Sequence, residues 1–433
     1  RRTKSPLGKR EDGFHLALAI EGGGMRGCIS AGMVAAVQYL GLEDAFDSVY
    51  GSSAGTIIGS YFITRQLPWF GPEIYYDSLT TAGRNFIDTR RLLRAVGLGL
   101  LDPRLAKDVI FRREQGKPVL NLDFLLKETA IVNKPLDWDR FVEMQKVQPL
   151  HIVASGLKSE KSFVMDMERG SFTTMEAMTD CMHASCLLPG IAGPLMNIWI
   201  DGNGTNTNGE TRLALGNNVV SSDGQPAEPL ADALVYEPMP YRSAVKEGGA
   251  THVVVLRTRP DGVDVTGKTS IFERMILRRF FLKKNKLRNI YKRLRSHLHK
   301  KLYAEDVIIL NEAAKDTRDY RNASSTDPQL MAIAVGPGFP EVTRLEVGRG
   351  PIFDGVRRGF ARAYDALVED PSERGRGHIV AREYFPDAIL DYDPTEIDSK
   401  GQSAFETVLK RGDTKNKFPK SLGKTASEAG APR

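Results

Sequence analysis

Apolar positions along the chain form two kinds of pattern: short unbroken runs, and longer stripes at helical spacing. Runs and stripes follow one another in turn along the sequence. The runs predict strands buried on both faces, and they occupy residues 15–20, 46–50, 149–155, 162–166 and 252–256. The stripes predict helices, for example over residues 27–40 and 174–186. Because strands that alternate with helices are typical of an α/β fold, we expect a mostly parallel sheet flanked by helices.

The last third of the chain shows weaker patterns of the same kind. Apolar residues predict strands at 331–335 and 342–347 and a helix at 352–367. We therefore expect a small α+β extension at the C-terminal side of the main sheet.

Two glycine-containing segments follow the first two predicted strands. Residues 21–27 read EGGGMRG, and consecutive glycines let backbone N–H groups turn toward one point, as an oxyanion hole requires. Residues 51–55 read GSSAG, a G-x-S-x-G motif that places Ser53 on a tight turn between a strand and a helix. A helix that begins at Ala54 directs the positive end of its dipole at this serine. Together, at this spacing, the two segments predict a serine acyl hydrolase.

The order of these motifs resembles that of the patatin-like acyl hydrolases, in which G-G-G-x-R-G precedes a G-x-S-x-G elbow. The resemblance implies that Ser53 is the nucleophile and that an aspartate alone assists it. It also implies an oxyanion loop braced by Arg26, although a surface cation is the alternative interpretation of this arginine. The loop glycines are Gly22, Gly23, Gly24 and Gly27.

A further block, ASCLLPG at residues 184–190, resembles a family motif in which a helix ends beside the active site. It makes Ser185 a supporting residue. The resemblance is specific over residues 15–259 and loose beyond them.

Two aspartates compete for the catalytic position. Asp232 is followed by the valine, the two prolines and the strand of the family pattern, but Ala233-Leu234 replaces the expected glycine pair. Larger side chains at these positions can narrow the pocket or shift the backbone. Asp201, in the sequence DGNG, fits an ordinary turn equally well. We favour Asp232 and keep Asp201 as the alternative.

The chemistry requires one carboxylate beside the serine, because serine is a poor nucleophile until a base takes its proton. An aspartate can be that base where little water reaches it and its basicity rises. The alternative is a Ser–Asp–His triad, whose histidine would be His252, His297, His299 or His378. These four lie in a buried strand, a basic helical stretch or a charged segment, so we favour the dyad. His151 lies inside a predicted strand and is expected to pack in the core.

Composition limits the partners and the compartment. The 433 residues carry a net charge of +6, and no apolar run approaches the roughly 18 residues of a membrane span. The three cysteines are odd in number and lack metal-binding spacing, which indicates reduced thiols in a reducing compartment. We expect a cytoplasmic or peripheral membrane protein without metal or organic cofactor.

The charge concentrates in residues 271–303, where twelve lysines and arginines face one acid, Glu273. Their apolar neighbours fall at helical spacing: Phe272, Met275, Ile276, Phe280, Leu287, Tyr291, Leu294, Leu298 and Leu302. The segment therefore predicts one or two basic amphipathic helices. They are either packed helices with a solvated face or a surface that binds anionic lipid headgroups. Nucleic acid is not an expected partner, since no recognition motif accompanies the charge.

These patterns divide the chain into four parts. Residues 1–13 form a polar tail and residues 14–260 the catalytic domain, in which 198–230 are rich in Asn, Gly and Ser and indicate a loop insertion. Residues 261–395 hold the basic helices and the extension, and residues 396–433 are expected to be disordered. The predicted function is hydrolysis of acyl esters in phospholipids or related glycerolipids. The alternative is a lipid-surface binding or scaffold protein that keeps the fold without activity.

Overall fold

The computed structural model describes residues 5–67, 70–96, 98, 118–198, 213–215, 228–267, 271–316, 318–391 and 403. Nine described strands form one mixed sheet with the order β6-β5-β7-β3-β2-β1-β8-β9, and β4 pairs with β3 beside this path. The strands are β1 Leu16–Ile20, β2 Ser48–Ser52, β3 Leu150–Gly156, β4 Lys161–Met165, β5 Met196–Ile198, β6 Leu213–Leu215, β7 Glu228–Ala231, β8 His252–Leu256 and β9 Gln329–Ile333.

The five central strands, from β3 through β2, β1 and β8 to β9, are parallel. Strands β4 to β7 join them by antiparallel pairing on the β3 side. The expected α/β fold with a mostly parallel sheet and flanking helices is confirmed. Because parallel strands end at the same edge, β1 and β2 bring the glycine loop and the serine turn together there.

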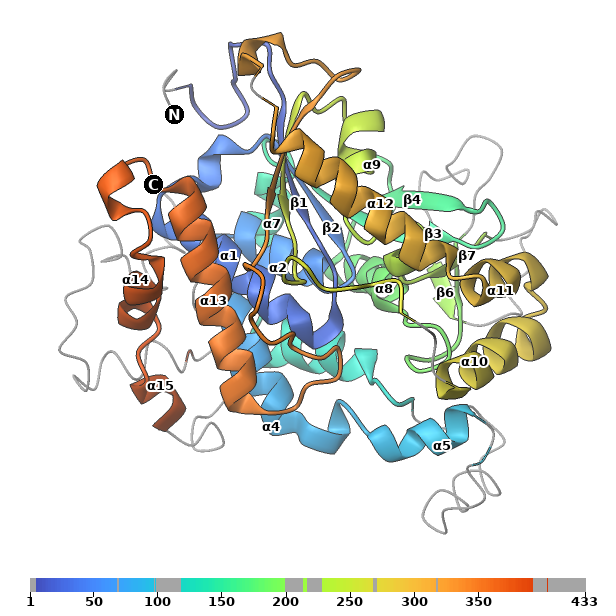
Figure 1. Cartoon of the computed structure of the whole chain (residues 1–433). Coiled ribbons are helices and arrows are strands. Elements are labelled where there is room, and N and C mark those ends of the chain that lie inside the picture. The colour runs from blue at the N-terminus through green and yellow to red at the C-terminus, as the bar shows by residue number, and fades with distance from the viewer. Residues whose placement is uncertain are drawn as a thin grey trace.

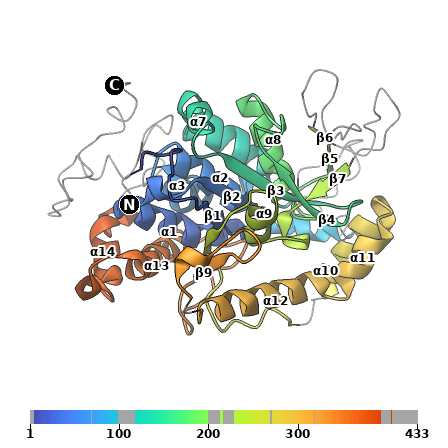
Figure 2. The same cartoon turned by 90° about the horizontal axis from the view of Figure 1, so that it is seen from above.

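Successive residues of each central strand pack on opposite faces of the sheet. In β1, Leu18 and Ile20 belong to the larger core cluster, and Ala17 and Ala19 to the smaller one. Figures 1 and 2 show the resulting layers, with α2 and α8 on one face of the sheet and α9 and α12 on the other. Both faces of the central strands are covered, as their unbroken apolar runs predict.

Helices follow the strands in sequence as the stripes predict. Those of the first 250 residues are α1 Gly27–Tyr39, α2 Ala54–Ile63, α3 Phe70–Glu73, α4 Thr80–Ala82, α5 Leu92–Ala95, α7 Trp138–Met144, α8 Met175–Cys186 and α9 Tyr241–Lys246. The later ones are α10 Ile271–Leu277, α11 Arg288–Arg295, α12 Leu298–Ala313, α13 Arg349–Leu367, α14 Gly377–Tyr384 and α15 Ala388–Asp391. A π-helical segment, Arg278–Lys284, joins α10 to the loop before α11.

The C-terminal extension shares the core of the main sheet. Strand β9 pairs with β8, and α13 packs directly on α1. Two glycines allow this close helix contact: a Cβ at Gly32 would lie 1.9 Å from the carbonyl oxygen of Val356, and one at Gly359 would lie 1.9 Å from that of Ile29. Since α1 begins directly after the glycine loop, the extension is fixed against the element that carries this loop.

Two local expectations are corrected. Residues 342–347 form a turn and no strand, because Val342 is buried while Arg344 and Val347 face solvent. The segment 198–230 is not only a loop, since β6 and most of β7 lie within it and join the sheet. The division that makes residues 1–13 a tail stays a prediction; within it, Arg10 donates a hydrogen bond of 2.7 Å to Asp47.

The predicted disordered segment, 396–433, lies outside the described residues except for Ser403. This serine is buried, and its hydroxyl donates a hydrogen bond of 2.9 Å to Oε1 of Glu73.

Candidate active site

Ser53 stands on the turn between β2 and α2, at the carboxyl end of the sheet. Its backbone angles, φ 51° and ψ −124°, are unfavourable for a residue with a side chain. The flanking glycines make the turn possible: a Cβ at Gly51 would lie 2.6 Å from Cα of Thr56, and one at Gly55 would lie 2.2 Å from the carbonyl oxygen of Ile20. The strained turn exposes the hydroxyl to a cavity while the rest of the serine is buried.

Ser185 holds this turn from the end of α8. The backbone N–H of Ser53 donates a hydrogen bond of 2.8 Å to Oγ of Ser185, which in turn donates to the carbonyl oxygen of Val153 in β3. Ser185 therefore links the strained turn to the central sheet. This position agrees with the supporting role expected from the sequence.

Asp232 lies within hydrogen-bond distance of the serine. Oγ of Ser53 donates to Oδ2 of Asp232 at 2.9 Å, and the backbone N–H of Leu234 donates to Oδ1 at 2.8 Å. The carboxylate is buried, and burial raises its pKa to about 6, although both hydrogen bonds and the Arg344 guanidinium lower the pKa. The competing candidate, Asp201, lies outside the described residues.

The residues that replace the expected glycine pair do not displace Asp232. Ala233 is fully buried, and Leu234 lines the cavity with its side chain while its N–H orients the carboxylate. The Ala-Leu pair therefore adds apolar wall to the cavity and keeps the Ser53–Asp232 contact.

The glycine loop lies beside the serine. A Cβ at Gly22 would be 2.6 Å from Cβ of Ser53, so only glycine allows this approach. The N–H of Gly22 donates to the carbonyl oxygen of Pro238 at 3.4 Å. The N–H groups of Gly23 and Gly24 have no acceptor among the described residues, and both glycines line the cavity. These two are the loop donors available to an oxyanion.

Backbone geometry suggests one donor that the motif comparison did not include. Ala54 is the first residue of α2, and its N–H has no acceptor among the described residues. Since it directly follows the serine, it occupies the usual position of an oxyanion donor in a G-x-S-x-G turn.

The remaining two loop residues have other surroundings. Gly27 does not line the cavity: its N–H donates to the carbonyl oxygens of Gly24 and Met25, and a Cβ there would strike Tyr75. We therefore correct its assignment from an oxyanion donor to a packing residue. Arg26 is buried and lines the cavity, and it forms an ion pair with Glu341, so the alternative of a surface cation is wrong.

A turn from the C-terminal extension braces the same loop. The N–H of Met25 donates to the carbonyl oxygen of Arg344 at 3.1 Å, and Glu341 pairs with both Arg26 and Arg259. Sequence reasoning missed this turn because the apolar residues of 342–347 predicted a strand.

Ser53 lines two neighbouring spaces. The larger is a cavity of about 670 Å³, lined by the glycine loop, Asp232, Leu234, Arg344 and the start of α12. The smaller is an apolar space of about 30 Å³ with side chains that include Leu79, Phe86 and Leu125. An ester carbonyl placed at the serine thus has a polar cavity on one side and an apolar pocket on the other.

No described histidine bonds to Ser53 or Asp232. His252 and His378 have carbonyl acceptors elsewhere, and His151 stacks on Tyr50 with its Nδ1 2.8 Å from Asp166. His299 lines the large cavity, where burial lowers its pKa to about 4. The geometry brings together a serine and an aspartate without a histidine between them.

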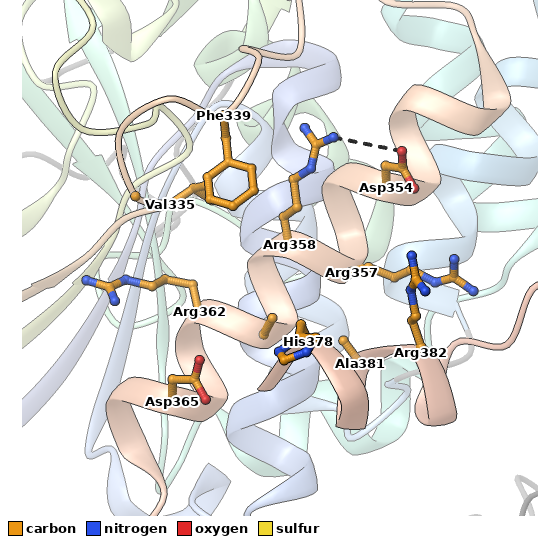
Figure 3. Close-up of a pocket in the computed structure, with 12 residues that line it drawn as sticks. Val335, Phe339, Asp354, Arg357, Arg358, Arg362, Asp365, His378, Ala381 and Arg382 are labelled. Carbon is orange, nitrogen blue, oxygen red and sulfur yellow. Dashed lines mark ion pairs between the residues drawn. The ribbon is translucent and has the colours of Figure 1, made fainter. Parts of the chain in front are cut away.

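A second cavity lies on the C-terminal extension, between α13 and α14. Its volume is about 530 Å³, and none of the predicted site residues lines it. Figure 3 shows that its arginines point in different directions. Arg357 is bound to the carbonyl oxygen of Phe385 and Arg362 to that of Ala334, so both join elements of the fold.

Two further searches cover the described part of the chain. No cluster of His, Cys, Asp or Glu there has the arrangement of a metal site. None of its helices combines the length and the apolar character needed to cross a bilayer.

The fold and the site define an α/β protein with a serine on a strand–helix turn, an adjacent glycine loop and an aspartate at hydrogen-bond distance. A family model described as patatin-like phospholipase matches residues 18–245, more than half of the chain. The chain therefore belongs to the patatin-like phospholipase family, a family of lipid acyl hydrolases.

Other comparisons add little to this assignment. The solved structures include a similar chain, the crystal structure of VipD from Legionella pneumophila, with 13% sequence identity and a TM-score of 0.32. The alignment covers 95% of this chain and 82% of that one. A search of curated proteins gives no match.

Proposed function

We propose that the protein hydrolyses acyl ester bonds of phospholipids or related glycerolipids through Ser53 and Asp232. The observation that carries the proposal is the hydrogen bond of 2.9 Å from the serine hydroxyl to a buried carboxylate. A pKa of about 6 leaves this carboxylate ionised at neutral pH and more basic than an ordinary aspartate.

In the first half of the reaction, Asp232 takes the proton of the Ser53 hydroxyl as Oγ attacks the ester carbonyl. The carbonyl oxygen becomes an anion, which the N–H groups of Gly23, Gly24 and Ala54 can stabilise. When the C–O bond to the alcohol breaks, the leaving oxygen takes the proton from Asp232. An acyl-enzyme on Ser53 remains.

In the second half, water replaces the alcohol. Asp232 accepts a proton from the water as its oxygen attacks the acyl carbonyl, and it returns this proton to Oγ of Ser53 when the acyl–serine bond breaks. A fatty acid is released and the dyad is restored. The buried carboxylate alone moves the proton in both halves.

The two spaces at the serine support a lipid ester as substrate. The apolar pocket, with Leu79 and Phe86, can take the first part of an acyl chain, and the wider cavity can take the polar remainder. Since the apolar pocket holds only about 30 Å³, a long chain requires its side chains to move apart.

The proposal places the enzyme at a lipid surface in a reducing compartment. All three cysteines are free and buried, which supports a protein without disulfides. The alternative is a scaffold protein that keeps the fold and binds lipid without turnover. It is less well supported, because Ala233 and Leu234 leave Asp232 beside the serine.

The test incubates the protein with a mixed lipid extract and identifies the released fatty acids and lyso-lipids by mass spectrometry. We expect release by the wild type and none by the Ser53→Ala variant. Ser60→Ala is a matched control, because Ser60 lies in α2, the helix that follows Ser53, and its hydroxyl donates to the carbonyl oxygen of Ile57 one turn earlier. Equal release by the Ser53 variant, or none by the wild type on lipids and soluble esters, would contradict the proposal.

A further inference from the structure

One side of α10 combines exposed apolar and basic side chains. Ile271 is 74% exposed and Met275 37% exposed, and a spacing of four residues places them on the same face. Arg274, Arg278 and Arg279 are exposed around them. The sequence placed Met275 in an apolar stripe that either packs on the domain or binds lipid, and its exposure excludes the first alternative for this residue.

The opposite side of this segment is firmly packed. Ile276 lies against Gly190, where an added Cβ would be 2.5 Å from its Cγ2, and Phe280 is buried. The helix is thus fixed at Gly190, and Ile271 and Met275 on its other side remain exposed. The exposed apolar residues are consequently not the result of a loosely placed helix.

The basic side chains of this region are not neutralised within the described part of the chain. Nine exposed cations there form no ion pair with another described residue: Arg274, Arg278, Arg279, Lys283, Lys286, Arg288, Lys292, Arg295 and Lys301. Elsewhere, many exposed arginines pair with aspartate or glutamate, as Arg318 does with Asp316. A surface with this much unpaired charge attracts an anionic partner.

The packed side of α10 borders the active-site cavity. Glu273 of α10 and both His299 and Lys300 of α12 line the cavity that contains Ser53. Leu298, directly before them, is 41% exposed. Figure 1 shows α10 and α11 together at the end of the molecule away from α14.

We propose that the docking face, defined as Ile271, Arg274, Met275, Arg278 and Arg279, binds anionic lipid membranes. Its apolar side chains enter the acyl region while its arginines bind headgroup phosphates and carboxylates, as in interfacial helices. The active-site cavity, which Glu273 of the same helix lines, is then held close to the lipid. This inference deepens the proposed function. The part that rests on the proposed function is that the membrane supplies the substrate. Binding to the membrane itself does not depend on catalysis.

Charge and apolar contact predict separate losses of binding. Each cation near an anionic surface strengthens binding about fivefold, so removing four weakens it by several hundredfold at most. Binding should also weaken as salt rises, because exposed charges are screened. Loss of the apolar side chains should weaken binding while leaving its salt dependence in place.

The experiment measures co-sedimentation with vesicles of phosphatidylcholine plus phosphatidylserine and with vesicles of phosphatidylcholine alone, at low and high salt. The charge variant combines Arg274→Gln, Arg278→Gln and Arg279→Gln of the docking face with Lys283→Gln, an exposed cation that follows it in sequence. The apolar variant combines Ile271→Ser and Met275→Ser. Matched controls are Lys146→Gln, Lys246→Gln, Arg374→Gln and Arg382→Gln for charge, and Ile308→Ser with Ile309→Ser for the apolar change. All four variants change side chains that are exposed.

We expect wild type and controls to sediment with the anionic vesicles only, and the two docking-face variants to lose this binding. Hydrolysis of a soluble ester should stay at wild-type level in every variant, which also checks folding. Vesicle binding without any ester turnover would uphold the docking face and reject the proposed function. Equal sedimentation of docking-face and control variants would overturn the docking face. A second outcome would also overturn it: the wild type binds an RNA oligonucleotide but no vesicles, and the charge variant no longer binds the RNA.

Discussion

Replacing Asp232 by asparagine should remove activity and, at neutral pH, stabilise the fold. Asparagine keeps the shape of the side chain, and its oxygen can accept the N–H of Leu234 while its amide faces Oγ of Ser53. It removes a buried negative charge. The loss of the base should lower turnover by about four orders of magnitude, the scale of comparable lesions in catalytic triads.

The gain in stability follows from the pKa of the buried carboxyl. Burial raises this pKa from 3.8 to about 6 in the folded protein. Each unit corresponds to about 1.4 kcal/mol, so ionised Asp232 costs the native state about 3 kcal/mol. As pH rises from about 4 to 6, the unfolded chain loses this proton first, so wild-type stability falls across that range. Above pH 6 the penalty is constant.

Urea unfolding of the wild type and the Asp232→Asn variant, followed by circular dichroism, measures this difference. The variant should be more stable by about 3 kcal/mol above pH 7, and the two should converge near pH 4. Asp391→Asn, at an exposed aspartate, is the control and should leave stability nearly unchanged. A difference that does not vary with pH, or a variant less stable than the wild type above pH 7, would refute the reasoning.

Three further predictions concern the same site. The kcat/KM of a soluble ester should fall tenfold per pH unit below about pH 6, where Asp232 becomes protonated. Arg344→Gln should move this fall to higher pH, because the guanidinium lowers the pKa of Asp232. A kcat/KM that stays constant from pH 5 to 8 would contradict the role of Asp232 as base. Ser185→Ala leaves the buried N–H of Ser53 without its acceptor, so the free energy of unfolding should drop by about 1–3 kcal/mol and turnover should fall. Ser60→Ala, the control, should leave both the free energy of unfolding and turnover unchanged. Gly22→Ala places a Cβ 2.5 Å from the carbonyl oxygen of Ser52 and should abolish turnover, while Gly350→Ala, with open space around it, should not; an active Gly22 variant would exclude the close approach of loop and serine.

The sequence predicted the parts of the site that local patterns encode. The glycine loop directly follows strand β1, and the turn at Ser53 directly follows β2. Both segments require glycine because of their backbone geometry, and a short motif records this requirement. Asp232 was favoured through its downstream pattern, and the structure places it beside the serine. Its catalytic role stays a prediction.

Contacts between distant segments could not be predicted in the same way. The apolar residues Val342, Leu345 and Val347 suggested a strand, but the backbone there forms a turn in which the carbonyl oxygen of Arg344 accepts the N–H of Met25. The strands β6 and β7 are short and lie in an Asn- and Gly-rich segment, and they gain their order from pairing with β5. Exposure of Met275 likewise depends on which side of α10 meets Gly190, and periodicity alone does not decide this.

Covalent labelling with a fluorophosphonate, followed by peptide mass spectrometry, tests the central claim most directly. Such a probe reacts with an activated serine and remains on its Oγ. We predict a single adduct on Ser53 in the wild type, none in Ser53→Ala, and much slower labelling in Asp232→Asn, because the base that activates the hydroxyl is missing. Labelling of the Asp232 variant at the wild-type rate, or an adduct on another serine in its place, would contradict the Ser53–Asp232 dyad.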